Sequence, residues 1–432
     1  MNKKKLPSID IFALSLLCLC CSQVYANQIS GSVSADSLLS DNTRKQTNDP
    51  IEERQNIYQA GLSADYSNWL IDLEANYQWF EHQYAENTQS DENYGDGNSR
   101  LVIGKKEDPI SLDLSHSRHM LLSTPDAVGL IENQEEREIL SARPEVRKRV
   151  FNADLLTLGG QLTRVKFPDD ELQNSKRNGV VLGWVHPLSQ VSVLQAVAQQ
   201  QEISFDYSPL ADYTSTSSML AYGVELRKLK YGLKFGYNES DPETGDKYSA
   251  PTYELSAAYE SGFNQFTFSA NRSLTDSSFG NGNLDNAGLI PDSDGLSTEI
   301  DRIDRINLAL NWDTQALCGR CVFSAGVTAV DDDYLEKDEQ SLSLYTQTRF
   351  SYAFSSAASI ALAVTRSDID FDNEIVATDY TLSYISLEYG YQFSSGVNVR
   401  LTARREDRDT ESLLGAGAYE ETTYGAGLGY NF

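Results

Sequence analysis

From residue 57 onward, apolar and polar residues alternate with a period of two in many short segments of the chain. In the first clear segment Trp69, Leu73 and Tyr77 fall on one face, while Glu74 and Gln78 fall on the other. A period of two is the repeat of a β-strand with one apolar face. The same pattern recurs in segments 231–237, 253–259, 306–312 and 397–403. The sequence therefore predicts an all-β protein.

The ends of these segments distinguish a membrane barrel from a soluble β-sandwich, which would alternate in the same way. Aromatic residues collect there, as in the rings at the two water interfaces of a transmembrane barrel. These residues are Trp69, Trp79, Tyr231, Tyr237, Trp312, Phe354, Tyr391 and Phe393. Short turns on one side and long loops on the other are typical of such barrels. The expected tight links are at 67–68, 107–109, 262–264, 355–357 and 394–396, and the expected long polar loops are 40–56, 85–99, 123–135, 208–216, 276–298 and 407–418.

About 20 such segments fit between residue 28 and the end of the chain, each near the ~10 residues that a tilted strand needs to span the hydrocarbon. Because segments 137–150 and 190–205 alternate poorly, the pattern is compatible with 16 to 20 strands. No linker divides the chain. We expect residues 27–432 to form a single transmembrane antiparallel up-and-down β-barrel.

The first 26 residues have the features of a cleaved signal peptide. Lys3, Lys4 and Lys5 precede a run of roughly 11 apolar residues, which is too short to cross a bilayer as a helix. Small residues follow at Val24 and Ala26. A lipoprotein is the alternative, but Cys18, Cys20 and Cys21 each follow Leu or Cys, where lipid attachment requires a small residue. The expected location is the outer membrane of a Gram-negative bacterium, in contact with its lipids.

The composition argues against a nucleic-acid-binding protein and against a disordered chain. With a formal net charge of −28, the chain lacks the clustered cations that bind nucleic acid. Its 24 Tyr, 16 Phe and 4 Trp are too many aromatic residues for a disordered acidic chain.

The last segment places Tyr424, Leu428, Tyr430 and Phe432 on one face and three glycines on the other. A terminal Phe preceded by alternating aromatic and aliphatic residues resembles the signal that is read by the outer-membrane barrel assembly machinery. Tyr430 and Phe432 would carry this signal. The alternative is an ordinary edge strand of a soluble sheet.

Charged residues on the polar faces of the segments are expected to line the barrel interior. They are Asp72, Glu74, Lys234, Glu254, Arg305, Arg349, Glu388, Arg400 and Arg404. The arginines on the late strands could form a selectivity ladder for an anionic solute. The mixture of acids and bases favours salt bridges across the wall instead.

Cys318 and Cys321 have the spacing of a dithiol oxidoreductase, but such a pair belongs at a helix N-terminus. Here the two cysteines fall in a predicted periplasmic turn, where a disulfide is the favoured interpretation. Zinc binding would require further ligands that are not nearby.

No nucleophile, phosphate-loop or metal motif is recognisable, so we expect neither an enzyme nor a cofactor. His116 and His119 are three residues apart on a predicted strand and would point to opposite faces, as would Ser115 and His116. Asp331, Asp332 and Asp333, with Asp292 and Asp294, could bind a divalent cation, although solvated acidic loops are the simpler interpretation.

Residues 28–170 and the last strand resemble a family of outer-membrane barrels encoded with exopolysaccharide production and the PEP-CTERM protein-sorting system. The resemblance rests on a first strand ending in Ser40-Asp41-Asn42, a second strand from Ile57, and the stretch 110–167. That stretch contains a Ser-rich strand, Asn133 and Arg137, and then Pro144, Arg147 and Arg149. The resemblance implies a passage for exopolysaccharide, with polysaccharide or export proteins as partners. A general diffusion porin and a surface or adhesion barrel are the alternatives.

Overall fold

The computed structural model describes residues 28–105, 108–123, 127–151, 153–168, 170–279, 300–337, 339–372, 379–410 and 417–432. They form one closed sheet of 20 antiparallel strands. The strands are β1 (Gln28–Ser40), β2 (Glu53–Ser67), β3 (Ile71–Tyr84), β4 (Glu92–Ile103), β5 (Ile110–Leu122), β6 (Gln134–Val150), β7 (Asp154–Lys166), β8 (Ser175–Pro187), β9 (Ser192–Phe205), β10 (Tyr213–Glu225), β11 (Leu229–Pro242), β12 (Tyr248–Ser261), β13 (Asn264–Asp276), β14 (Arg302–Thr314), β15 (Cys321–Tyr334), β16 (Glu339–Ala353), β17 (Ala358–Phe371), β18 (Tyr380–Gln392), β19 (Val397–Thr410) and β20 (Tyr419–Asn431).

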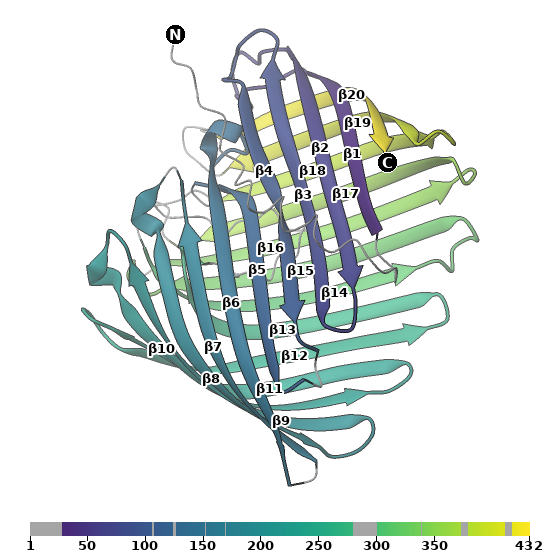
Figure 1. Cartoon of the computed structure of the whole chain (residues 1–432). Coiled ribbons are helices and arrows are strands. Elements are labelled where there is room, and N and C mark those ends of the chain that lie inside the picture. The colour runs from purple at the N-terminus through teal and green to yellow at the C-terminus, as the bar shows by residue number, and fades with distance from the viewer. Residues whose placement is uncertain are drawn as a thin grey trace.

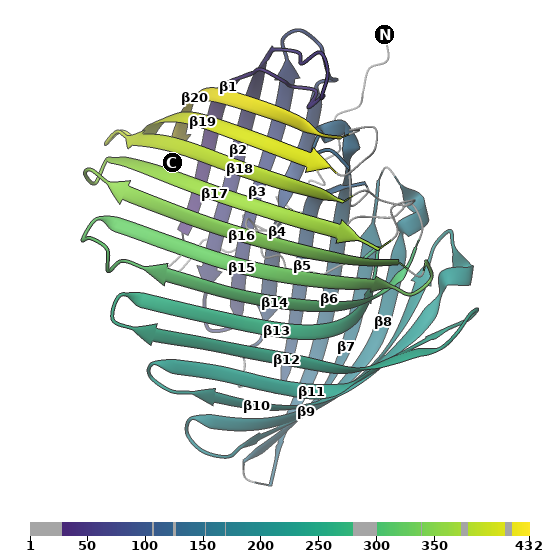
Figure 2. The ribbon, with the colours of Figure 1, turned by 180° about the vertical axis from the view of Figure 1, so that it is seen from behind.

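Each strand pairs with the next one along the chain, and β1 pairs with β20 to close the barrel. Figures 1 and 2 show strands β1–β9 forming one wall and the later strands forming the opposite wall, with the first and last strands side by side. The predicted all-β up-and-down barrel is confirmed, at the upper end of the expected strand count. The poorly alternating segments are β6 and β9.

Three short 3-10 helices, η1 (Ile131–Asn133), η2 (Glu171–Gln173) and η3 (Pro209–Ala211), lie in connections between strands. Among the residues that the structure describes, no helix is long and apolar enough to cross a membrane. The segment expected to be a signal peptide, residues 1–26, lies outside the described residues.

The two faces of the sheet differ in polarity, as the alternation predicts. Leu140, Leu182, Leu310 and Leu428 share the outward face, where between 49% and 61% of each residue is exposed. The opposite face is the inner one, because Arg177 on that face of β8 hydrogen-bonds to Asp276 at the end of β13, a strand that is not a neighbour of β8 in the sheet.

The strands extend further than the apolar alternation indicates. Residues 92–99 of the expected 85–99 loop belong to β4, and residues 407–410 of the expected 407–418 loop belong to β19. Polar residues continue the ladder of backbone hydrogen bonds there without an apolar face, so the period-two signal ends before the strand does. The expected alternation of connection lengths is also incomplete, since the link 335–338 is shorter than the turn 315–320.

Candidate functional site

All nine charged residues predicted for the interior fall on the inner face by strand register. Three of them pair with a neighbour on the wall at 2.6 Å: Lys234 with Glu254, and Arg305 with Asp332. Asp72 pairs with Lys105, and Arg404 pairs with Glu406. Arg349 is exposed on the inner face of β16, and Glu388 lies on β18 near Arg400.

Of the four arginines, Arg305 is 4% exposed and is held by Asp332. Arg404 lies over the ring of Tyr384, with 4.8 Å between the guanidinium carbon and the ring centroid. Asp332 thus neutralises the charge of Arg305, and the ring of Tyr384 covers the guanidinium of Arg404. The arrangement therefore favours salt bridging along the wall over an open ladder of free arginines.

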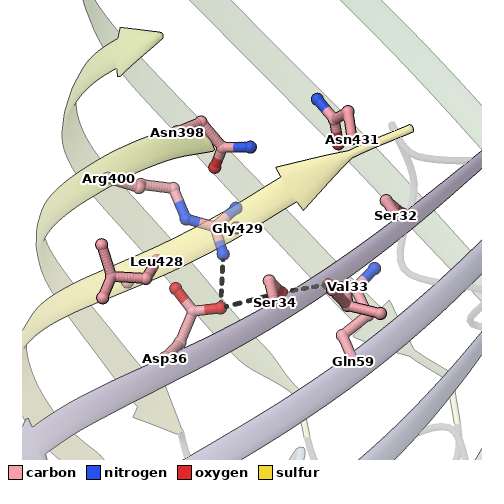
Figure 3. A pocket seen from close by; sticks show the side chains of 11 residues that line it. Ser32, Val33, Ser34, Asp36, Gln59, Asn398, Arg400, Leu428, Gly429 and Asn431 are labelled. Atoms are coloured by element: carbon pink, nitrogen blue, oxygen red, sulfur yellow. Dashed lines mark hydrogen bonds and ion pairs between the residues drawn. The ribbon is translucent and has the colours of Figure 1, made fainter. Parts of the chain in front are cut away.

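A polar pocket lies on the inner face where the first and last strands meet (Figure 3). Its volume is about 210 Å³, and hydroxyl, amide and charged side chains of β1, β2 and β19 surround it. Arg400 of β19 donates a hydrogen bond to Asp36 of β1 at 2.8 Å, passing over β20 (Figure 3). The lining residues are Ser32, Val33, Ser34, Asp36, Gln59, Asn398, Arg400, Gly427, Leu428, Gly429 and Asn431.

Glycines of β20 allow β1 and β19 to meet across the last strand. A Cβ atom on Gly427 would lie 1.9 Å from an oxygen of Asp36, and one on Gly429 would lie 2.6 Å from Oδ1 of Asn398. The side chains of the two flanking strands therefore occupy the space above the glycines. The sequence signal for this was the row of glycines on the inner face of the last strand.

A chain of uncharged polar groups continues from this pocket along the wall. Ser34 Oγ lies 3.4 Å from both an Asp36 carboxylate oxygen and Gln59 Oε1, and Gln59 Nε2 donates to Gln78 Oε1 at 2.8 Å. The pocket and this chain span five strands, β19, β20, β1, β2 and β3. Such side chains can exchange hydrogen bonds with a hydroxylated solute or with water.

At the long-loop end of the barrel, the hairpin of β13 and β14 separates from the wall. β12 and β13 pair only as far as Tyr253 and Arg272, whereas β13 and β14 stay paired up to Asp276 and Arg302. Residues 272–279 and 300–304, which we call the inward hairpin, turn into the interior. The face of the hairpin that continues the outward face of β13 and β14 therefore packs against the inner faces of other strands.

The buried anchor of the inward hairpin is an ion pair. Arg177 of β8 donates to Asp276 at 2.8 Å and to Ser278 Oγ at 3.0 Å, and the hydroxyl of Tyr213 on β10 donates to Asp276. Asp276 is 0% exposed and Arg177 is 3% exposed. Two charges removed from water in this way require each other as partners.

Further contacts hold the hairpin along its length. Arg302 donates to Ser240 Oγ at 3.3 Å and to the backbone carbonyl of Asp246 at 3.2 Å. Tyr248 donates to Asp304 at 2.6 Å, and Arg272 binds the same carboxylate.

The tip of the hairpin reaches strands far from β13. Phe279 packs against a buried cluster of four residues on β5, β6, β7 and the residue that follows β7: Leu121, Ile139, Val165 and Phe167. Arg137 donates to the carbonyl of Phe279 at 3.2 Å, and Ile300 packs against Ile203, Phe205 and Tyr213. The inward hairpin therefore crosses the interior from β13 to β5 and narrows it at the long-loop end.

Arg177, Tyr213 and Asp276 were not recognised in the sequence. A signal was present, because Arg272, Arg302 and Asp304 occupy positions that the alternation assigns to the apolar outward face. A run of charges on that face of one hairpin indicates that the hairpin leaves the lipid-facing wall.

At the base of the hairpin, Asp301 accepts a hydrogen bond from the backbone N–H of Glu336 at 2.9 Å. Its other carboxylate oxygen is buried and has no hydrogen-bond partner among the described residues. Burial raises the pKa of Asp301 to about 6, and the negative charge of Glu336 acts in the same direction. Asp301 is thus a titratable group at the attachment point of the hairpin.

The remaining predicted features are distributed over the barrel. Cys318 and Cys321 form a disulfide at the short-turn end, between β14 and β15. His116 and His119 point to opposite faces: His116 contacts Tyr77 and Glu138 outside, and His119 contacts Asp96 inside. In the described ranges no cluster of three or more His, Cys, Asp or Glu could hold a metal ion. Asp332 binds Arg305, while Asp292 and Asp294 lie outside the described residues.

Comparison with known proteins gave structural matches only. No family model matches the chain, and no curated protein matches it. Among solved structures it is similar to OccK2 (OpdF) of Pseudomonas aeruginosa, with a TM-score of 0.39, 10% identity, and coverage of 94% of this chain and 98% of that one. It is also similar to the FrpB iron transporter of Neisseria meningitidis, with a TM-score of 0.44, 11% identity, and coverage of 93% and 82%. Because the scores are below 0.5, we draw no functional conclusion from them.

Proposed function

We propose that this protein is a non-enzymatic channel for small polar solutes in the outer membrane of a Gram-negative bacterium. The location is supported by the apolar outward wall, bordered by exposed aromatic residues such as Trp69, Phe263 and Tyr237. The polar inner face supports a water-filled passage. Outer-membrane lipids and the barrel assembly machinery are its proposed partners, and Tyr430 and Phe432 its proposed assembly signal.

The position of the inward hairpin inside the barrel is the observation that favours small solutes over a polymer. It occupies part of the interior at the long-loop end, and the buried Arg177–Asp276 pair fixes it there. A fixed segment inside a barrel reduces the cross-section open to solutes. A narrowed passage suits small molecules better than a hydrated polymer.

Export of an exopolysaccharide is the second candidate. It is supported by the resemblance of residues 28–170 and by the amide and hydroxyl groups of Ser34, Gln59, Gln78 and Asn398 on the inner face. Planar amides and hydroxyls can bind sugar hydroxyls without requiring a charge. A polymer would have to pass beside the inward hairpin or displace it.

Conductance of the purified barrel in planar lipid bilayers tests the channel. We expect stepwise currents, which increase in an Arg177→Ala variant because the inward hairpin loses its anchor. Arg405→Gln combined with Glu420→Gln removes an outward-facing pair, 2.9 Å apart, and should leave the conductance unchanged. A folded, inserted barrel that passes no current would overturn the channel and favour a surface or adhesion role.

Addition of an acidic exopolysaccharide to the same bilayer separates the two candidates. A small-solute channel should conduct as before, because the polymer does not enter it. Block of the current from the short-turn side, relieved in an Asn398→Ala variant, would instead favour the polysaccharide passage.

A further inference from the structure

A cluster of cations lies on the outward face of the barrel near its long-loop end. Arg118 of β5, Arg164 and Lys166 of β7, and Lys176 of β8 are on the same face as the exposed leucines by strand register. All four are exposed at their side chains, for example 49% for Arg164 and 47% for Lys176. We call these four residues the outer cation cluster.

Within this cluster Arg118 pairs with Glu136, whereas Arg164 and Lys176 share a single carboxylate. Arg164 lies directly opposite Lys176 in the β7–β8 register, an arrangement that places two like charges side by side. Both bind one carboxylate, that of Asp206, which lies 3.4 Å from Arg164 and is hydrogen-bonded by Lys176. Lys166 follows on the same face of β7, opposite Glu138, whose carboxylate hydrogen-bonds His116 at 3.1 Å. An additional anion here would relieve the repulsion.

Apolar side chains lie next to the cluster in the direction of the short-turn end. Leu140 is opposite Arg164 and is 55% exposed, and Leu162 and Val180 are 51% and 57% exposed on the same face. The cations therefore border the apolar outward wall. A ligand bound here could place an anionic group on the cations and aliphatic chains along the wall.

On the same outward rim, β17 and β19 each carry more carboxylates than cations. Arg366 of β17 pairs with Asp368 at 2.8 Å, and Asp370 follows on that face. Arg405 of β19 is followed on its face by Asp407 and Asp409. In a chain with a net charge of −28, a concentration of exposed cations on β5, β7 and β8 is a specific feature of this sector.

We propose that the outer cation cluster binds the phosphate groups of a phosphorylated lipid headgroup in the membrane leaflet on the long-loop side. The inference rests on the proposed membrane location. Arg164 and Lys176 would bind a phosphate together with Lys166, since guanidinium and ammonium groups form charge-assisted hydrogen bonds to phosphate oxygens. The acyl chains would lie along Leu140, Leu162 and Val180.

Lipid binding to the purified, folded barrel in detergent tests this proposal by native mass spectrometry. The probes are diphosphorylated lipid A, the same lipid without its phosphates, and inorganic phosphate as a competitor. We expect the wild type to prefer the phosphorylated lipid. The combined variant Arg164→Gln, Lys166→Gln and Lys176→Gln should bind it on the order of a hundredfold more weakly, because each of the three interfacial cations contributes about 1 kcal/mol.

Arg366→Gln is the matched control, because it removes an outward rim cation from a sector rich in carboxylates. Its affinity for lipid A should equal that of the wild type. Equal binding by the triple variant, or equal binding of the dephosphorylated lipid, would overturn the proposal. Complete displacement of the lipid by inorganic phosphate would assign the cluster to free phosphate instead, and would also overturn it.

Insertion into vesicles and conductance are measured separately on the same proteins. A triple variant that inserts and conducts normally but binds lipid A weakly supports the lipid site. A wild type that fails to insert overturns the membrane location itself, whereas one that inserts without lipid preference overturns only the lipid site.

Discussion

Arg177 and Asp276 form a buried ion pair at 2.8 Å although they belong to β8 and β13, which are not neighbours in the barrel. The contact is possible because the long-loop end of β13 separates from β12 beyond Arg272 and turns into the barrel interior. One residue pair thus joins two distant parts of the wall through the interior. The shape of the passage depends on this link.

Replacing Asp276 with Ala should destabilise the barrel, because it leaves the guanidinium of Arg177 buried without its partner. Loss of one member of a buried pair costs about 3 to 5 kcal/mol. Urea titration of the folded protein in vesicles would measure the change in the free energy of unfolding. The double variant Arg177→Met and Asp276→Leu should be less destabilised than either single change, and additive losses would contradict the interpretation.

The strand pattern could be predicted from the sequence because each strand places one face against an apolar surrounding and the other against a polar interior. Leu308 and Leu310 of β14, and Leu401 of β19, reveal this directly. The same rule assigns nine charged residues to the inner face from their place in the alternation. Strand ends that extend beyond the apolar belt do not alternate in this way. The sequence therefore predicts loops where the structure has the start of β4 and the end of β19.

The contacts of the inner face could not be predicted in the same way. The place of a residue in the period-two alternation assigns its side chain to one face of the sheet, but it does not indicate which distant strand that side chain will contact. Arg177 and Tyr213 look like ordinary inner residues, and Asp276 looks like the end of a strand. Their association depends on the separation of β13 from β12, which involves long-range packing of Phe279 and Ile300.

Stability should depend on pH through Asp301, whose pKa is raised by burial to about 6 from an ordinary value of 3.8. Above pH 6 the carboxylate is charged in both the folded and unfolded states, and the folded state carries the cost of burying it. As the pH falls from about 6 toward 4 the folded protein takes up a proton before the unfolded chain does, so this group makes the folded state more stable.

The Asp301→Asn variant isolates this contribution from all other titrating groups. It should be more stable than the wild type at pH 7.5, and the difference should shrink toward pH 5. Thermal unfolding of both proteins across that range is the measurement. A difference that is constant with pH would show that Asp301 is not the group responsible.

The Cys318–Cys321 disulfide should contribute little to the stability of the barrel. It closes a loop with a sequence separation of 3, and the entropy removed from the unfolded chain by so short a loop corresponds to about 2 kcal/mol or less. The double variant Cys318→Ser and Cys321→Ser should therefore insert and conduct like the wild type. A large loss of folded protein would instead indicate that the turn between β14 and β15 directs assembly.

Gly427 should resist substitution because its inner side is occupied by Asp36. A Cβ atom there would lie 1.9 Å from the carboxylate, so Gly427→Ala must displace Asp36 from Arg400. We expect a loss of about 1 to 3 kcal/mol, the usual effect of forcing an extra carbon into an occupied space. Gly223→Ala on β10 is the control, since its nearest neighbour would be Val193 at 3.4 Å. If urea titration shows equal effects at the two positions, the contact between β1 and β19 across β20 is not what requires the glycine.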